Sequence, residues 1–237
     1  PVRIDAVALL GEPANSGLVD DPICAANGNF IHRDHDLAFP ALSASMNVHR
    51  FYNSLAADRR GVFGAGWSSL FDVALRGIDT SVITAQLADG AVIAFVADAD
   101  DTWSTTDRRH HRLRRTADGW EMSSGPAGER SWRFDVAGRL VGWQVGLSTV
   151  DVERDGTGSI HALSQPRSGR RIDVTWTDGL ITALTTDDGR RLTYTYGDAA
   201  TLARAESAAG WFDYSYDGRL MLTAVDPDGV AQFVNVY

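Results

Sequence analysis

The chain has 237 residues, of which 44% are hydrophobic and seven are Trp, so it has enough apolar material for one large domain or two small ones. Its net charge is −9 and all 22 basic residues are Arg, a balance that argues against a surface built to attract nucleic acid. Apolar runs are too short to cross a bilayer, and the single Cys, Cys24, excludes an internal disulfide framework.

The chain starts at Pro1, without Met and without a basic-then-apolar export signal. We expect it to be a piece of a longer protein, with no signal peptide in this piece. We expect that longer protein to be secreted or displayed at the cell surface.

Residues 1–75 are predicted to form a β-rich opening module. Asn27-Gly28 is a tight-turn signal, because Gly readily adopts the positive φ that hairpin turns need. The three glycines between residues 61 and 66 predict a flexible corner that delivers Trp67 onto a sheet, where its large side chain would fill the core.

Residues 76–130 are predicted to form connecting hairpins. Asp89-Gly90 and Asp118-Gly119 each stand between runs of alternating polarity, which indicates a hairpin turn at each place. Turn signals recur every few residues and leave no room for a long amphipathic helix, so the fold is predicted to be all-β throughout.

Residues 131–237 contain a repeat of about 20 residues, in about five copies. Each copy begins with a strand in which apolar and polar side chains alternate, so that one face is aromatic and the other polar. In three copies the apolar positions are Ile172, Val174 and Trp176, then Leu192, Tyr194 and Tyr196, then Phe212, Tyr214 and Tyr216. A turn and a second strand follow, and the anchors of the second strands are Leu140, Ile160, Leu180, Leu202 and Leu220.

A two-stranded unit cannot bury an aromatic face alone, whereas stacked units can. We therefore predict successive antiparallel β-hairpins that form a curved, spiralling sheet. A propeller is the alternative, because two 20-residue units together reach the length of one four-stranded blade.

These repeats resemble a known family. Tyr216-Asp217 followed by Gly-Arg-Leu, with Asp-Pro-Asp-Gly at 226–229, is similar to the YD repeats of Rhs-type proteins. The segments Arg-Phe-Tyr-Asn-Ser (50–54) and Phe-Gly-Ala-Gly-Trp (63–67) resemble the opening module that precedes the first YD repeats in that family. Together with the middle stretch, the resemblance covers nearly the whole chain.

The resemblance implies a non-catalytic part of a large shell that encloses a C-terminal toxin. Its expected partners are the remainder of its own shell, the toxin domain and a delivery machinery, with no nucleic acid and no membrane. The alternatives are an extracellular adhesion or glycan-binding module and, less favoured, a glycan hydrolase. The exposure of Tyr194, Tyr196, Tyr214 and Tyr216 separates these hypotheses, since buried rings indicate a core or cavity lining and exposed rings a ligand surface.

Two loop motifs are weak matches to ligand sites. Residues 61–68 have the glycine spacing of a phosphate-binding loop, but Trp67 stands where that loop needs Lys. Asp98, Asp100 and Asp101 suggest calcium, but Trp103 stands where a calcium loop needs Gly. We expect no nucleotide site at the first motif and a solvated acidic turn at the second.

His32 and His35, interleaved with Asp34 and Asp36, raise the question of a zinc site. On a strand, residues three apart point to opposite faces, so the two histidines could bind one ion only from an irregular loop. We expect two solvated loop histidines.

Residues 108–115 form the basic patch Arg-Arg-His-His-Arg-Leu-Arg-Arg. We expect its arginines to form ion pairs across strands with the Asp-rich turns, with a polyanionic partner as the alternative. Cys24 with His32 or His49, and Ser68 with His49, are conceivable nucleophile–base pairs outside any catalytic motif. We predict no catalytic residue, no metal site and no cofactor.

The last strand, within residues 229–237, is expected to lie at an open sheet edge. Phe233, Val234 and Val236 are apolar, and neither Pro nor Lys is present to discourage pairing with another strand. We expect the chain to self-associate through this segment.

Overall fold

The computed structural model describes residues 11, 18–19, 23–24, 27–40, 45–98, 101–105, 111–125 and 129–236. It is almost entirely β, with 61% of residues in strands. The remaining regular elements are the short 3-10 turns η3 (Ser54–Ala56), η4 (Leu70–Asp72) and η5 (Asp198–Ala200). No helix in the described part of the chain is long and apolar enough to cross a bilayer.

The N-terminal module is built around a small sheet, which we call the inner sheet. Its antiparallel strands are β3 (Ile31–Leu37), β4 (Val48–Asn53) and β7 (Trp67–Ser69), with β4 in the middle. Two short pairs flank it: β1 (Leu18–Val19) with β2 (Ile23–Cys24), and β5 (Arg60–Gly61) with β6 (Gly64–Ala65).

The rest of the chain forms one antiparallel sheet of 17 strands, in which each strand pairs with the next along the chain. Its first half contains β8 (Ala74–Arg76), β9 (Val82–Gln86), β10 (Val92–Ala97), β11 (Thr102–Ser104), β12 (Arg112–Thr116), β13 (Gly119–Ser124), β14 (Arg130–Phe134) and β15 (Leu140–Val145). Its second half contains β16 (Ser148–Arg154), β17 (Ile160–Gln165), β18 (Arg170–Thr177), β19 (Leu180–Thr186), β20 (Arg191–Tyr196), β21 (Leu202–Ser207), β22 (Gly210–Asp217), β23 (Leu220–Val225) and β24 (Ala231–Val234).

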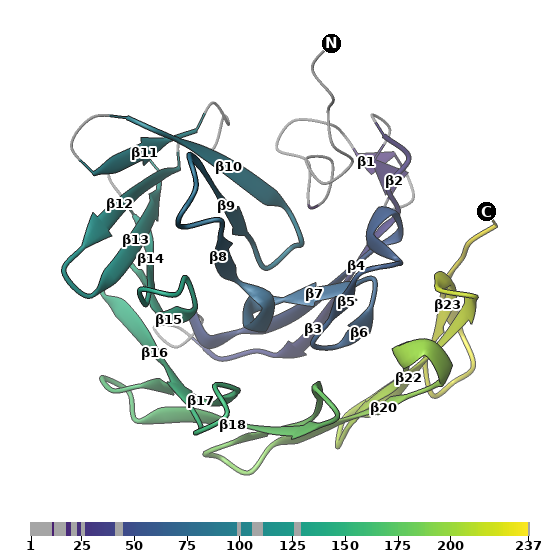
Figure 1. Ribbon diagram of the computed structural model, residues 1–237. Coiled ribbons are helices and arrows are strands. Elements are labelled where there is room, and N and C mark those ends of the chain that lie inside the picture. Colours follow the sequence, from purple (N-terminus) through teal and green to yellow (C-terminus); the bar gives the residue numbers. More distant parts are fainter. Residues whose placement is uncertain are drawn as a thin grey trace.

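This long sheet curls tightly at its start and then opens (Figure 1). Ala74 on β8 forms a bridge with Arg139, and the amide of Leu75 donates to the carbonyl of Gly138 at 2.8 Å, so the first strands come round to meet β15. Beyond that point the strands sweep away as a curved band, and no pairing within the described residues joins β24 to β8. The prediction of successive hairpins in one curved sheet is confirmed, and the hairpins do not separate into propeller blades.

A β-bulge recurs once in every repeat and helps to explain the curvature. The register shifts at Arg133/Phe134, Glu153/Arg154, Thr175/Trp176, Thr195/Tyr196 and Ser215/Tyr216, each near the end of a first strand. Because a bulge bends its strand and increases the local twist, a bulge at every period curves the sheet consistently in one direction.

In three repeats the residue at the bulge also forms a hydrogen bond with the preceding repeat. The indole Nε1 of Trp176 donates to the carbonyl of Ile160 at 2.7 Å, and the hydroxyl of Tyr196 donates to that of Ile181 at 2.5 Å. Arg154 occupies the same position one repeat earlier, and its Nη2 donates to the carbonyl of Leu140 at 3.0 Å. These side chains therefore connect successive hairpins in addition to the backbone ladder.

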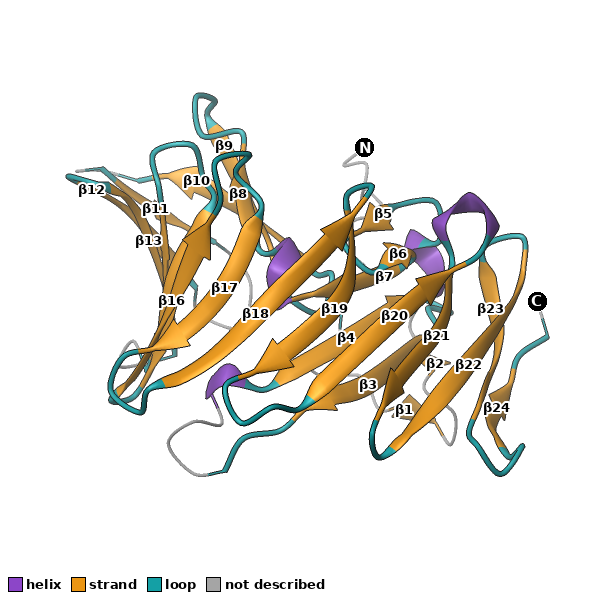
Figure 2. Ribbon diagram, turned by 90° about the horizontal axis from the view of Figure 1, so that it is seen from below, coloured by secondary structure: helices purple, strands orange, loops and turns teal. Residues whose placement is uncertain are grey.

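Burial follows the predicted alternation. On β20, Leu192 and Tyr194 are buried while Thr193 and Thr195 are more exposed, and on β18 Ile172 and Val174 are buried while Asp173 and Thr175 are exposed. The buried face of the band packs on the inner sheet, which lies in the concavity of the band (Figures 1 and 2). One hydrophobic core therefore joins the N-terminal module to repeats that follow it by more than 100 residues.

Candidate functional site

The contact between the inner sheet and the last repeats is the most elaborate polar site in the described part of the chain. It faces β20 and β22, which carry the tyrosines of the YD repeats. Tyr194 is 3% exposed and Tyr214 is 7% exposed, while Tyr196 and Tyr216 are half-buried against the same core. The tyrosines are therefore internal, as expected of a core or cavity lining rather than of a row of sugar-binding rings.

Arg50, in the middle of β4, is the centre of this site and is 1% exposed. Its Nε and Nη2 donate to the two carboxylate oxygens of Asp36 at 2.6 and 2.9 Å. Nη2 also lies 3.3 Å from Asp34 and donates to the hydroxyl of Tyr214 at 3.1 Å. A buried guanidinium is tolerated only with such partners, since an isolated buried charge is strongly unfavourable.

Four aromatic rings enclose the same guanidinium. Cation–π attraction acts within about 6 Å of a ring centroid, and it is stronger where water is excluded. The distances from Arg50 Cζ to the ring centroids are 4.7 Å for Trp67, 5.3 Å for Tyr194, 5.6 Å for Tyr214 and 5.7 Å for Phe63. Two of these rings come from the N-terminal module and two from the repeats, so the charge lies where the two parts meet.

The tyrosine hydroxyls complete the network across the interface. Tyr194 donates to Asp36 at 2.7 Å, and Tyr214 donates to Asp34 at 2.6 Å. Burial raises the pKa of both tyrosines well above the ordinary value, and the neighbouring aspartates raise it further, so both hydroxyls stay protonated and act as donors. Burial by itself would raise the pKa of Asp34, but the charge of Arg50 and the hydrogen bond from His32 lower it to about 2.

Trp67 and Tyr52 extend the contact along the inner sheet. The indole Nε1 of Trp67 donates to the hydroxyl of Tyr216 at 3.0 Å, so Trp67 packs in the core as predicted. The hydroxyl of Tyr52 donates to the carbonyl of Arg219 at 2.8 Å and accepts from the amide of Met221 at 3.0 Å. Aromatic side chains of the N-terminal module thus form hydrogen bonds with the repeats, and tyrosines of the repeats form hydrogen bonds with the N-terminal module.

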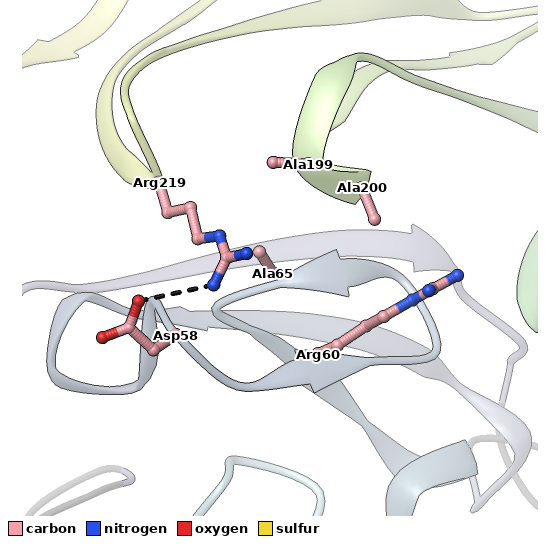
Figure 3. A pocket seen from close by; sticks show the side chains of 6 residues that line it. All are labelled: Asp58, Arg60, Ala65, Ala199, Ala200 and Arg219. Carbon is pink, nitrogen blue, oxygen red and sulfur yellow. Dashed lines mark hydrogen bonds and ion pairs between the residues drawn. The ribbon is translucent and has the colours of Figure 1, made fainter.

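The hairpin β5–β6 makes a second contact with the repeats, at the rim of the sheet (Figure 3). Asp58 and Arg219 form an ion pair of 3.4 Å, and Gly64 lies so close to η5 that an added Cβ would be 2.4 Å from the carbonyl oxygen of Ala200. Arg60 lines the same hollow, but its guanidinium points away from the Asp58–Arg219 pair.

A pocket of about 720 Å³ lies between the inner sheet and the first curl of the long sheet. Its lining combines aromatic and basic side chains, among them Phe51, His49, Arg33, Trp132 and Trp143. Burial, together with the charges of Arg33 and His35, lowers the pKa of His49 to about 4, so this imidazole is neutral near pH 7. The cavity presents aromatic surface and positive charge toward the concave side.

The structure corrects the expectation of two solvated loop histidines. His32 and His35 both lie on β3, where they point to opposite faces because they are three residues apart. His32 is buried and bonded to Asp34 at 3.0 Å, while His35 is exposed and its ring lies 4.4 Å from that of His49. Within the described residues, no group of three or more potential ligands is arranged to hold a metal ion.

The glycine-rich segment, the basic patch and the acidic turn lie on different elements of the fold. Residues 61–68 form parts of β5, β6 and β7, and they are followed by the single 3-10 turn η4 instead of the α-helix that a phosphate-binding loop needs. Of the basic patch, residues 108–110 lie outside the described part of the chain. Arg114 on β12 pairs across strands with Glu121 on β13, and not with one of the Asp-rich turns that we expected. Asp98 and Asp101 lie between β10 and β11, while Asp100 is outside the described residues.

The two candidate nucleophiles, Cys24 and Ser68, both lie on short strands of the N-terminal module. Cys24 is buried on β2 and takes part in no disulfide. The hydroxyl of Ser68 donates to the backbone carbonyl of Phe51 at 3.4 Å, so it is engaged by the inner sheet itself.

Of two comparisons with known proteins, one found a match, which covers the N-terminal part of the chain. No curated protein matches the chain. Residues 20–95, which include the inner sheet and the first strands of the long sheet, match the family model described as "Domain of unknown function (DUF6531)".

Proposed function

We propose that this chain is a non-catalytic wall segment of an Rhs-type shell, and that the complete, exported protein encloses a C-terminal toxin. The observation that supports this proposal is the single curved sheet that winds around the inner sheet and buries the repeat tyrosines on its concave side. A sheet whose strands pair successively can be extended by further hairpins without changing its pattern.

In this proposal the N-terminal module is the core on which the first repeats wind. The Arg50 cluster fixes β20 and β22 on the inner sheet, and the bulge in each repeat maintains the curvature. Later hairpins would pair with the outer edge of β24, which has no partner strand within the described residues. The cavity beside Trp132 and Trp143 would then face the enclosed volume.

The test is protease protection in the full-length protein that contains this segment. We expect the C-terminal cargo to resist digestion in buffer and to become sensitive only at urea concentrations that unfold the sheet. Arg50→Met should shift that sensitivity to lower urea, whereas Arg114→Met, which removes an exposed charge on β12, should not.

Two results would contradict the proposal. One is a cargo that is digested as fast within the full-length protein as when it is produced alone. The other is specific binding of this chain to a glycan that is lost in Trp143→Ala with stability unchanged, a result that would favour the adhesion hypothesis.

A further inference from the structure

Four arginines from four separate elements line one cleft at the rim of the long sheet, which we call the basic cleft. They are Arg60 on β5, Arg76 at the end of β8, Arg139 just before β15 and Arg154 at the end of β16. The cleft has a volume of about 420 Å³, and Asp72 is the only carboxylate among the described residues that line it. This concentration of positive charge stands out in a chain whose net charge is −9.

Three of these guanidiniums have no carboxylate as a hydrogen-bond partner within the described residues. Arg60 donates to the backbone carbonyl of Asp178 at 2.7 Å, and Arg154 donates to the backbone carbonyls of Gly158 and Leu140 at 2.8 and 3.0 Å. Arg76 makes no hydrogen bond or ion pair in the same part of the chain. Only Arg139 is paired, with Asp135 at 2.7 Å.

Asp72 offers a single carboxylate against the four guanidiniums of the cleft. Its carboxylate accepts hydrogen bonds from the amides of Val62 and Ser69 and from the Ser69 hydroxyl, at 2.9 to 3.0 Å. Burial raises the pKa of Asp72 to about 6, while these hydrogen bonds and the charge of Arg76 act in the opposite direction. One negative charge near pH 7 therefore leaves most of the positive charge of the cleft uncompensated.

Arg154 also differs from the corresponding residues of the other repeats, because it is charged. The bulge positions of the other four repeats carry aromatic residues: Phe134, Trp176, Tyr196 and Tyr216. Trp176 and Tyr196 donate to a backbone carbonyl of the preceding repeat, as Arg154 does, but their donors are uncharged. This hydrogen bond between repeats therefore does not require a guanidinium. The Nε of Arg154 is buried and lacks a hydrogen-bond partner within the described residues.

We propose that the basic cleft binds a ligand with two or more oxyanion groups, held by Arg60, Arg76, Arg139 and Arg154. Guanidinium groups bind carboxylate and phosphate oxygens through paired N–H donors, and uncompensated charges in a cleft attract such anions. The cleft continues into a hollow of about 260 Å³ that shares Arg60 and Arg76 and adds Arg59. Guanidiniums distributed over both hollows suit a diphosphate or neighbouring carboxylates of an acidic peptide better than one small oxyanion.

The site is tested by calorimetric titration of the chain at low ionic strength with pyrophosphate and, separately, with a tetra-glutamate peptide. Arg76→Gln removes a charge without breaking any internal bond, and Arg154→Trp restores the aromatic donor of the other repeats while removing the charge. Each should weaken binding about tenfold or more, since a hydrogen bond to a charged group is worth one to two orders of magnitude in affinity. Arg112→Gln, on β12 and outside the cleft, is the control with the same change in charge.

Binding of pyrophosphate that both cleft variants weaken, but the control does not, supports the site with a phosphate-type ligand. Binding of the peptide alone with the same pattern supports it with carboxylates as the natural ligand. No binding of either probe, or equal weakening by Arg112→Gln, would overturn the proposal. Melting temperatures of Arg76→Gln and Arg112→Gln close to that of the unmodified chain would exclude misfolding as the cause.

Discussion

Arg50 joins two parts of the chain through contacts that a shorter or uncharged side chain could not reproduce. It binds Asp34 and Asp36 from β3 and meets Tyr194 and Tyr214 from the repeats. Removing one partner of a buried ion cluster leaves the remaining charges without compensation, which is far less favourable than losing an exposed pair.

Arg50→Met is therefore expected to lower the free energy of unfolding by about 3–5 kcal/mol. Arg114→Met, which breaks the exposed pair with Glu121, should change it by less than about 1 kcal/mol. Urea denaturation followed by Trp fluorescence measures both. Similar losses in the two variants would show that the Arg50 cluster does not hold the interface.

His49 gives the molecule a predicted response to acid. Burial lowers the pKa of His49 to about 4, below the usual value of 6.5, so between these pH values the unfolded chain binds a proton that the folded chain does not. Stability should therefore fall as the pH drops from about 6.5 to 4. His49→Gln should remove this decrease in the free energy of unfolding between pH 6.5 and 4. The difference between the two proteins at pH 8, where the imidazole is neutral, measures the effect of the substitution on packing and is subtracted. An unchanged slope in the variant would contradict the assignment.

Asp34 and Asp72 are expected to affect the pH dependence of stability in opposite directions. The pKa of Asp34 is lowered to about 2, so its contribution is present above about pH 3.8 and is lost as the pH falls through 2. The pKa of Asp72 is raised to about 6, so its protonated form favours folding below 3.8 and that contribution disappears as the pH rises through 6.

Sequence reasoning identified the residues of this site without their roles. Asp34, Asp36 and His32 were considered as zinc ligands because they are close together in the sequence. Their actual partners, Tyr194 and Tyr214, follow 158 and 180 residues later, and no local pattern reports such distant contacts. The available signal was a charged residue, Arg50, in a short run that also contains the apolar residues Val48 and Phe51.

At the level of elements, the hairpin repeat was predictable because its signals are local. Alternating polarity and Asp-Gly turns specify strands and their connections within about 20 residues. The regular bulge was not predicted, although in four of the five first strands its position coincides with the last aromatic residue. A bulge forms where two residues of one strand lie opposite one residue of the next strand. The alternation of polarity within a single strand does not reveal this pairing.

The β5–β6 hairpin is an element whose docking depends on a glycine. Gly64 has a φ of +100°, and a Cβ there would lie 2.4 Å from the carbonyl oxygen of Ala200. Gly64→Ala should therefore lower the free energy of unfolding by about 2–4 kcal/mol, through backbone strain and displacement of η5. Gly146→Ala is the matched control, since Gly146 also has a positive φ, +56°, but open space around it. Equal losses measured by urea denaturation would show that the contact with η5 contributes nothing.

At the scale of the whole molecule, the outer edge of β24 is predicted to pair with another strand. Val234 on β24 is 71% exposed, and unpaired edges with apolar side chains recruit further strands. We expect concentration-dependent self-association in sedimentation velocity, reduced by Val234→Lys. Val136→Lys is the control, because Val136 is 69% exposed in a turn away from that edge. A chain that stays monomeric at high concentration would contradict this prediction.

The winding of the repeats around the inner sheet could not be predicted from the sequence, because periodicity specifies a repeat but not what its inner face covers. The alternation on β20 and β22 indicated one buried face and left open whether that face lines an empty cavity or packs on another part of the chain. Aromatic and ionic contacts with β3, β4 and β7 fill it in the structure.

A double-mutant cycle between Asp34 and Tyr214 tests this arrangement most directly. The two side chains are joined by a hydrogen bond of 2.6 Å between β3 and β22, across the interface between the inner sheet and the repeats. The free energies of unfolding of Asp34→Asn, Tyr214→Phe and the double variant should show a coupling of about 1–3 kcal/mol, because residues in one buried network do not act independently. Additivity within about 0.5 kcal/mol, the behaviour of distant sites, would contradict the claim that the repeats wind on the inner sheet.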